Sequence, residues 1–253
     1  MFGGRVFVGQ NKSVALKALC LVFLGGSASA LFAASTLPSC TAGTLASYIT
    51  STSDPGGGCA IGVLDYFNFS YHSSPTNPGP LSSDLEVSVS GAGFSFSRAD
   101  GTPVTALPGQ TVQFEIDYQI VIDPAPIIGG GDMSLDPPTG NVVVTEYFCN
   151  DVAYRFTAAC LGNVIQPDVL TVGTPVTGFP LTASITFANP ARVSQNVGIS
   201  FTLIGGANGA SFDGLSATSQ VLSLSPEPAS AACLLFGLLA LGGGYKLRKQ
   251  RTR

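Results

Sequence analysis

The sequence predicts an all-β fold, an antiparallel β-sandwich ectodomain with an N-terminal signal helix and a single C-terminal transmembrane helix. Three observations predict it: short segments alternate apolar and polar residues, Gly- and Pro-rich stretches separate them, and apolar runs beside basic residues stand at both ends. Alternation with period two is typical of a strand that buries one face. We therefore expect a signal peptide at 1–30, a sandwich at 31–225 and a C-terminal tail with the membrane helix at 226–253.

The clearest strand is predicted at 111–122, where apolar residues occupy every second position from Val112 to Ile122. No helical spacing fits that pattern. Shorter patterns predict further strands at 67–71, 85–89, 94–96, 142–148, 181–187, 197–203 and 221–224. One turn of helix is possible at 44–49. Many short antiparallel strands favour two packed sheets, and a closed barrel is the alternative.

Turn-forming residues lie between these segments, for example at 54–58, 74–80 and 129–132. The stretch 130–141 is predicted as a loop, and its oxygen-bearing side chains Asp132, Asp136 and Asn141 are candidate calcium ligands. No EF-hand or nonapeptide spacing accompanies them, so a solvated acidic loop is the simpler interpretation.

Charge is distributed unevenly along the chain. Residues 31–225 hold fourteen acidic residues against only Arg98, Arg155 and Arg192, a formal charge of −11, although the whole chain carries −4. A domain with so few cations cannot neutralise phosphates, which makes nucleic acid an unsuitable partner. Cations, neutral glycans and proteins remain as possible partners.

The N-terminal segment has the order of a secretory signal. Basic residues up to Lys17 precede an apolar core at 18–26, and the small residues Ala28 and Ala30 follow. Signal peptidase requires such small residues, so cleavage after Ala30 is predicted. An uncleaved anchor is the alternative, but the apolar core is short for a membrane span.

The C-terminal segment combines three elements. Pro226, Glu227 and Pro228 precede an uncharged apolar run at 229–245, which is just long enough to cross about 30 Å of hydrocarbon as a helix. A basic cluster that would stay in the cytoplasm follows the run: Lys246, Arg248, Lys249, Arg251 and Arg253. A plain membrane anchor after a proline-rich turn is the alternative.

This tail resembles the PEP-CTERM sorting tail, which an exosortase recognises. The resemblance implies cleavage near the Pro-Glu-Pro motif and delivery to the surface of a bacterium that makes exopolysaccharide. Ser225 stands where Val is commoner in that family. The segments 40–71, 144–149 and 184–188 of the body also resemble an uncharacterised group of tagged β-rich bacterial proteins, and this second resemblance implies no reaction.

The body contains four cysteines, Cys40, Cys59, Cys149 and Cys160. An oxidising compartment would convert them to disulfides, and proximity favours Cys40 with Cys59 and Cys149 with Cys160 among three possible pairings. Zinc requires closely spaced cysteine pairs and histidines, which are missing, so no metal or other cofactor is expected.

Candidate catalytic residues are few. His72 is the sole histidine, and no nucleophile-elbow motif accompanies it, so we expect a solvated loop residue. Glu115 and Asp117 lie on the polar face of one predicted strand, about 7 Å apart, a separation that inverting glycosidases use. Alternation alone produces such a pair on a solvent face, and the chain has no Trp for a sugar platform.

The sequence therefore predicts a non-enzymatic exported protein of the cell surface or extracellular matrix, with a structural or biofilm role. Its expected partners are signal peptidase, exosortase, the inner membrane and exopolysaccharide. The alternative function is a glycan- or protein-binding β-sandwich module, which calcium could assist.

Overall fold

The computed structural model describes residues 35–52, 57–122, 127–149, 168–174, 177–187 and 194–222. All of them belong to one compact unit that begins at residue 34. In this part of the chain no helix is both long and apolar enough to cross a membrane. The predicted signal peptide and sorting tail lie outside the described residues.

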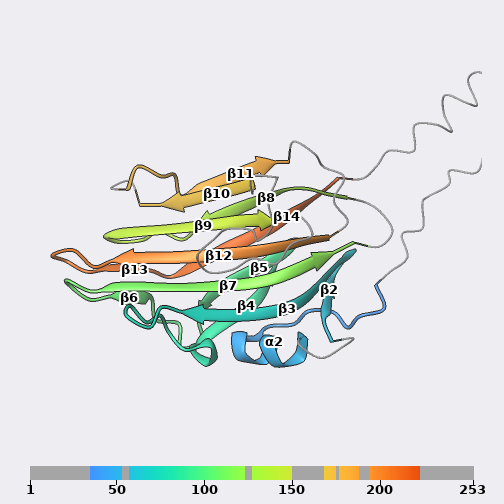
Figure 1. The fold of residues 1–253 in the computed structure, drawn as a ribbon, viewed down its shortest axis with the longest axis horizontal. Coiled ribbons are helices and arrows are strands. Elements are labelled where there is room, and N and C mark those ends of the chain that lie inside the picture. The colour runs from blue at the N-terminus through green and yellow to red at the C-terminus, as the bar shows by residue number, and fades with distance from the viewer. Residues whose placement is uncertain are drawn as a thin grey trace, which may run out of the picture. The chain divides into compact units, whose positions relative to one another are not determined.

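The described chain forms two six-stranded antiparallel sheets with one hydrophobic core (Figure 1). Sheet A has the strand order β10 (Asp168–Gly173), β9 (Asn141–Cys149), β12 (Ser194–Ile204), β7 (Thr111–Val121), β3 (Leu64–Ser73), β2 (Cys59–Ile61). Sheet B has the order β1 (Gly43–Thr44), β4 (Leu85–Ser90), β5 (Gly93–Arg98), β14 (Gly214–Leu222), β8 (Ile127–Leu135), β11 (Thr182–Thr186). The predicted all-β class is confirmed, and the two sheets are separate rather than closed into one barrel.

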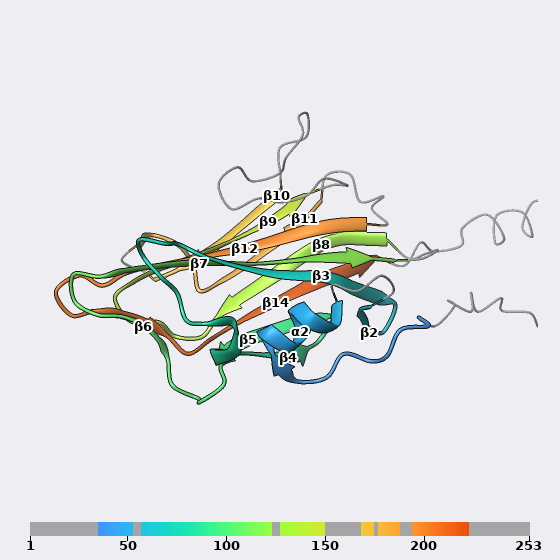
Figure 2. The same ribbon diagram turned by 60° about the horizontal axis from the view of Figure 1, so that its bottom comes forward.

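A third, two-stranded sheet pairs β6 (Val104–Ala106) with β13 (Ala210–Phe212) at one end of the molecule (Figure 2). Its Phe212 continues a stack of three rings. Phe114 and Phe201 have centroids 4.4 Å apart at an interplanar angle of 8°, and Phe201 and Phe212 follow at 5.6 Å and 14°. Stacked aromatic side chains therefore fill this end of the core.

Strand β7 confirms the strongest prediction from the sequence. Its apolar residues at even-numbered positions from Val112 to Ile120 are all buried, as one face of a strand against the core requires. The strand lies between β12 and β3, so it has a hydrogen-bonded partner on both sides. The opposite face of β7 carries the polar residues discussed below.

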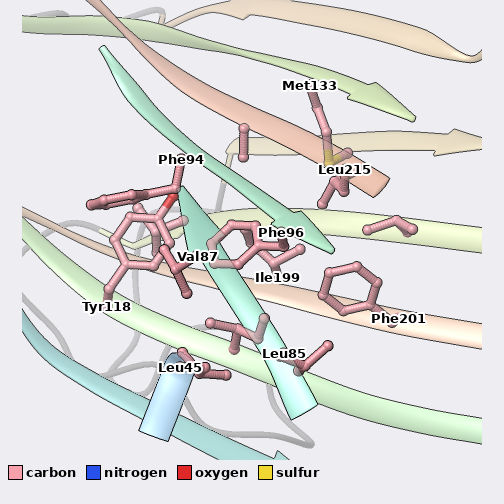
Figure 3. Packing of buried hydrophobic residues seen from close by; sticks show 14 of the residues in the cluster. Leu45, Leu85, Val87, Phe94, Phe96, Tyr118, Met133, Ile199, Phe201 and Leu215 are labelled. Carbon is pink, nitrogen blue, oxygen red and sulfur yellow. The ribbon is translucent and has the colours of Figure 1, made fainter. Parts of the chain in front are cut away.

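The middle of the core is an aromatic cluster that joins the two sheets. Phe94 of β5 contacts Tyr66 at 4.6 Å and Phe69 at 5.3 Å between ring centroids, both in edge-to-face geometry, and Tyr118 stacks on Phe69 at 5.2 Å. Figure 3 shows Phe94, Tyr118 and their neighbours between the strands. Each such pair contributes about 1 kcal/mol beyond simple burial.

In the strand predicted at 67–71, Phe69 and Tyr71 pack against the core as alternation requires, but Phe67 does not. A register shift separates Phe67 from Ser70, and Asn68 has a φ of 53°. The extra residue of this β-bulge places Tyr66 and Phe69 in the core, whereas Phe67 lies opposite Gln119 on the outer side of sheet A. Alternation read from the sequence cannot show such a shift.

The short helix α2 (Leu45–Thr52) confirms the predicted turn of helix. It buries Leu45, Tyr48 and Thr52, which share one helical face, and the Thr52 Oγ1 accepts a hydrogen bond from the Phe69 amide at 3.0 Å. The Tyr48 hydroxyl donates to the Thr41 carbonyl at 2.6 Å. These contacts fasten the helix to the edge of the sandwich.

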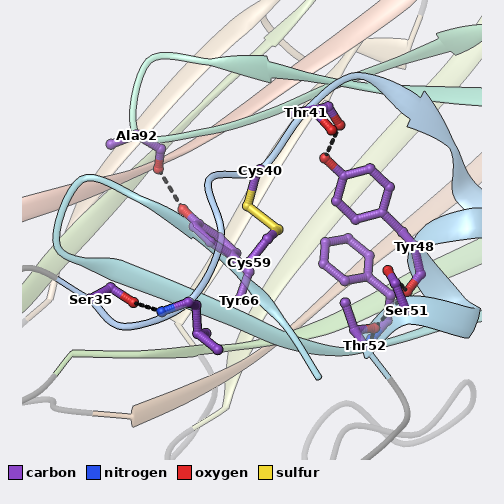
Figure 4. The surroundings of a disulfide bond; sticks show 11 residues. Ser35, Cys40, Thr41, Tyr48, Ser51, Thr52, Cys59, Tyr66 and Ala92 are labelled. Carbon is purple, nitrogen blue, oxygen red and sulfur yellow. Dashed lines mark hydrogen bonds between the residues drawn. A yellow bond between two sulfur atoms is a disulfide. The ribbon is translucent and has the colours of Figure 1, made fainter. Parts of the chain in front are cut away.

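A disulfide joins Cys40 to Cys59 and closes the segment that contains α2 (Figure 4). The sequence separation is 19 residues and the Cα–Cα distance is 4.8 Å. This pairing was the one that proximity favoured. Cys149 is also disulfide-bonded, and Cys160, its predicted partner, lies outside the described residues.

The glycine-rich segment 129–132 is part of strand β8, and the predicted turn there is wrong. These glycines allow a neighbouring strand and a core side chain to approach the backbone of β8 closely. A Cβ atom on Gly130 would lie 2.1 Å from the Ile185 carbonyl oxygen, and a Cβ on Gly131 would lie 2.4 Å from the Phe148 ring. Glycine is therefore required by close packing in a strand.

Candidate functional site

The outer face of sheet B contains a groove over the strands β14, β8 and β11. Its volume is about 460 Å³. Polar side chains from three separate parts of the sequence form most of its lining: Asp132, Ser134, Thr182, Ser184, Ser216 and Thr218. The lining is completed by Met133 and Ala183.

The strand register arranges these six polar residues as two rows of three. In one row Ser134 pairs with Ser216 on one side and with Thr182 on the other. In the next row Asp132 pairs with Thr218 and with Ser184 in the same manner. Since neighbouring strands lie about 4.8 Å apart and residues i and i+2 about 6.8 Å apart, the floor measures roughly 10 by 7 Å.

Alternation along each strand explains why short hydroxyl-bearing residues line the groove. Met133 and Leu135 of β8, and Leu215 and Ala217 of β14, are buried in the core, so the residues between them point outward. The outward residues are short. They fill little of the space above the sheet, which leaves a hollow.

Asp132 is the one charged residue among those that line the groove. Its Oδ1 accepts a hydrogen bond from the Gln220 Nε2 at 2.9 Å. A carboxylate has two oxygens with about four acceptor sites, so Asp132 retains capacity to accept further hydrogen bonds. The serine and threonine hydroxyls beside it can each donate and accept.

The outer face of sheet A brings together the three residues considered for catalysis. His72 pairs in register with Glu115, and Ser70 pairs with Asp117. The His72 Nε2 lies 3.3 Å from the Asp117 Oδ2, and the Ser70 hydroxyl donates to the same oxygen at 3.0 Å. His72 belongs to strand β3, so the prediction of a loop residue is wrong, although its side chain is 53% exposed.

Glu115 and Asp117 do not lie on an open solvent face as expected, because they are only 1% and 9% exposed. Burial raises the pKa of Asp117, while hydrogen bonds with Glu115 and Ser70 and the nearby His72 act in the opposite direction. Carboxyl groups in hydrogen-bond contact leave no room for a water between them, which an inverting glycosidase requires. The cluster therefore fits a polar connection between β3 and β7 better than a catalytic pair.

A third carboxyl group lies inside the sandwich. Glu146 of β9 faces the core, is 1% exposed, and its Oε1 lies 3.5 Å from the Tyr118 hydroxyl. Burial raises its pKa to about 8, the Tyr118 hydrogen bond lowers it, and the charge of Asp132 raises it further. At neutral pH this side chain is therefore mostly a neutral acid.

The structure disperses the three candidate calcium ligands. Asp132 lies within β8, Asp136 follows that strand, and Asn141 begins β9, so no loop collects them. Within the described ranges no group of three or more His, Cys, Asp or Glu side chains could hold a metal ion.

The predicted processing residues cannot be placed in the fold. The signal-cleavage residues Ala28 and Ala30, the motif Pro226-Glu227-Pro228 and the basic cluster at 246–253 all lie outside the described residues.

The sequence contained a signal for the groove that composition alone did not reveal. Small hydroxyl residues recur at every second position in Thr182, Ser184 and Thr186, and again in Ser216 and Thr218. Taken strand by strand, such residues are ordinary for a solvent face. Only the register across β14, β8 and β11 assembles them.

Comparison with family models and with curated proteins gave no match. Among solved structures the chain is similar to TmCBM61, described in complex with β-1,4-galactotriose, at 13% identity and a TM-score of 0.32, over 60% of this chain and 88% of that one. It is also similar to the enzymatically active domain of bacteriophage CBA120 tailspike protein 4, at 9% identity and a TM-score of 0.31, over 60% of this chain and 19% of that one. With TM-scores of this size, neither similarity identifies a shared ligand or activity.

Proposed function

We propose that the protein is a non-catalytic carbohydrate-binding module of the bacterial cell surface, and that it binds neutral glycan in the groove on sheet B. The observation that carries this proposal is the groove itself, in which two rows of hydroxyl and carboxylate side chains line a hollow of about 460 Å³. That volume lies in the range of small-molecule sites.

The chemistry of the lining favours a polyhydroxyl ligand. Sugar hydroxyls both donate and accept hydrogen bonds, and so do Ser134, Thr182, Ser184, Ser216 and Thr218. The carboxylate of Asp132 can accept from a sugar hydroxyl, and it disfavours phosphate or uronate groups through like charge. A neutral glycan therefore suits the groove better than an anion.

We propose no catalysis at this site. Glu115 and Asp117 lie on the outer face of sheet A, whereas the groove is on sheet B. Asp132 has no second carboxylate or histidine beside it among the residues that line the groove, so the acid and base that glycoside hydrolysis needs are not paired there.

The proposal includes export and sorting. A secretory signal at 1–30 and a tail at 226–253 that resembles an exosortase substrate would deliver the domain to a surface layer. The Cys40–Cys59 disulfide is in keeping with an oxidising compartment. There the module would attach its carrier to exopolysaccharide and so contribute to the matrix.

Affinity gel electrophoresis of the full-length protein in neutral polysaccharides tests the binding part. Ser134→Lys places a long charged side chain at the centre of the groove, and we expect it to reduce retardation at least tenfold. Thr202→Lys, on the outer face of sheet A, is the matched control. The polysaccharide should retard it as much as it retards the unchanged protein, each compared with its own mobility in a gel without polysaccharide.

Equal retardation of the Ser134→Lys and unchanged proteins, with both folded by circular dichroism, would reject the groove as the binding site. Repeating the measurement with a chelator tests whether calcium assists. The sorting part is tested in cells that lack the exosortase: unchanged size and location of the protein there would disprove it.

A further inference from the structure

The outer strands of the two large sheets differ in how their free edges are protected. β1 is only two residues long, and backbone hydrogen bonds with residues 38–40 cover β2. β10 begins with the charged Asp168, and its Gly173 amide donates to the Pro180 carbonyl. β11 has no charge, proline or bulge along its five residues, and it ends sheet B with no described strand beyond it (Figure 1). Proteins usually protect such edges, because an open edge is a template for pairing with another chain.

The strand register leaves the backbone groups at the even-numbered positions of β11 free. The Leu181 carbonyl accepts a hydrogen bond from β8 at 2.9 Å, and the Phe187 amide donates one to β8 at 2.8 Å. Odd-numbered residues therefore bond to β8, and the amides and carbonyls between them point away from the sheet. These groups belong to Thr182, Ser184 and Thr186. All three residues are exposed, and their backbone groups have no partner in the described parts of the chain.

This edge is complementary to a second copy of itself. Two antiparallel copies of β11, related by a two-fold axis at Ser184, place Ser184 opposite Ser184 and Thr182 opposite Thr186. In this register every free amide of one copy meets a free carbonyl of the other. On the inner side Ala183 meets Ile185, and both already pack against the core. A slip by one residue would place polar side chains opposite apolar ones.

We propose that the free edge of β11 is a dimerisation surface, where a second copy of this chain adds its own β11 in antiparallel register about Ser184. The occupant is a second copy because the edge is symmetric about Ser184 both in residue type and in the direction of its backbone groups. Sheet B then continues through both molecules.

The charges near the edge permit this pairing although the body is strongly acidic. No ionised side chain lies on β11 itself. Asp132 is one strand further in, opposite Ser184, so the two copies of Asp132 would be about 14 Å apart. That distance exceeds the screening length of about 8 Å at physiological salt. The pairing does not depend on glycan binding, and it would bring the grooves of the two copies side by side.

Sedimentation equilibrium of the full-length protein over the micromolar range tests the proposal. Five residues per copy form a smaller interface than the roughly 1,200 Å² of stable complexes, so we expect a weak, reversible dimer. Ser184→Lys and Ser184→Asp each place like charges opposite each other at the two-fold axis, and each should weaken association at least about tenfold. An equal mixture of the two variants pairs opposite charges and should dimerise again. Thr218→Lys, at an outward position two strands from the edge, is the matched control and should dimerise like the unchanged protein.

Amide hydrogen exchange tests the register. The amides of Thr182, Ser184 and Thr186 should exchange more slowly at dimerising concentrations, whereas those of Ala183 and Ile185, which bond to β8, should not change. Any association through the apolar segments at the termini is the same in every variant and cancels from the comparison.

Three results would overturn the inference. If Ser184→Lys dimerises like the unchanged protein, or if the mixture stays monomeric while both variants are folded by circular dichroism, the two-fold axis is not at Ser184. If the unchanged protein is monomeric at every concentration, the edge takes a strand of another protein or none at all.

Discussion

Replacing the buried Glu146 should change how the stability of the protein depends on pH. Its folded-state pKa of about 8 lies above the ordinary value of 4.5. Because the folded state binds this proton more tightly than the unfolded state does, Glu146 contributes to the free energy of unfolding. The contribution is fully present below pH 4.5 and is lost as the pH rises through 8. One pKa unit corresponds to about 1.4 kcal/mol, so the free energy of unfolding should fall by about 3.5 kcal/mol between pH 5 and pH 8 from this group.

Glu146→Gln removes the titrating group and preserves its size and its acceptor for the Tyr118 hydroxyl. The difference in unfolding free energy, variant minus unchanged protein, should therefore increase by about 3.5 kcal/mol from pH 5 to pH 8. Urea unfolding at several pH values, followed by far-ultraviolet circular dichroism and tyrosine fluorescence, measures it. Asp117 also has a raised pKa, but it is present in both proteins and cancels from the difference.

Glu86→Gln is the matched control, since Glu86 is a half-exposed residue of β4. The same difference in unfolding free energy is measured for this variant, as the effect of removing one carboxyl group from the surface of β4. A difference for Glu146→Gln that does not grow with pH relative to this control would refute the reasoning, because it would mean that Glu146 is ionised in the fold and finds a compensating partner there.

Two further predictions concern packing and covalent constraint. Replacing Cys40 and Cys59 together by serine should lower the free energy of unfolding by about 3 kcal/mol, since the closed loop spans 19 residues. Urea unfolding measures this change. An unchanged unfolding midpoint would contradict the prediction. Gly130→Ala should destabilise the protein by about 1–3 kcal/mol, because its Cβ would meet the Ile185 carbonyl at 2.1 Å. Gly206→Ala, where a Cβ meets nothing within 4 Å, should be nearly neutral, and equal thermal midpoints for the two variants would count against this account.

Local pattern was sufficient for much of the fold. The alternation from Val112 to Ile122 predicted strand β7, because only a strand places every second side chain on one face. The short separation of Cys40 and Cys59 predicted their disulfide, since nearby cysteines meet with little loss of chain entropy. These features depend on residues close together in sequence.

Other features depended on pairing between distant strands. The bulge at Asn68 decided which residues of β3 enter the core, and pairing with β11 and β14 made the segment around Gly130 a strand instead of a turn. Because β3 pairs with β7 in a shifted register after the bulge, His72 comes to lie beside Asp117.

By itself, the sequence determined that the body is antiparallel β structure with a polar and an apolar side to its strands, since that information lies in neighbouring residues. Only the tertiary structure decided that Asp132, Thr182 and Ser216 share one groove. They come from three strands far apart in the chain, and the hydrogen-bond register that aligns them is fixed by the packing of the whole sheet.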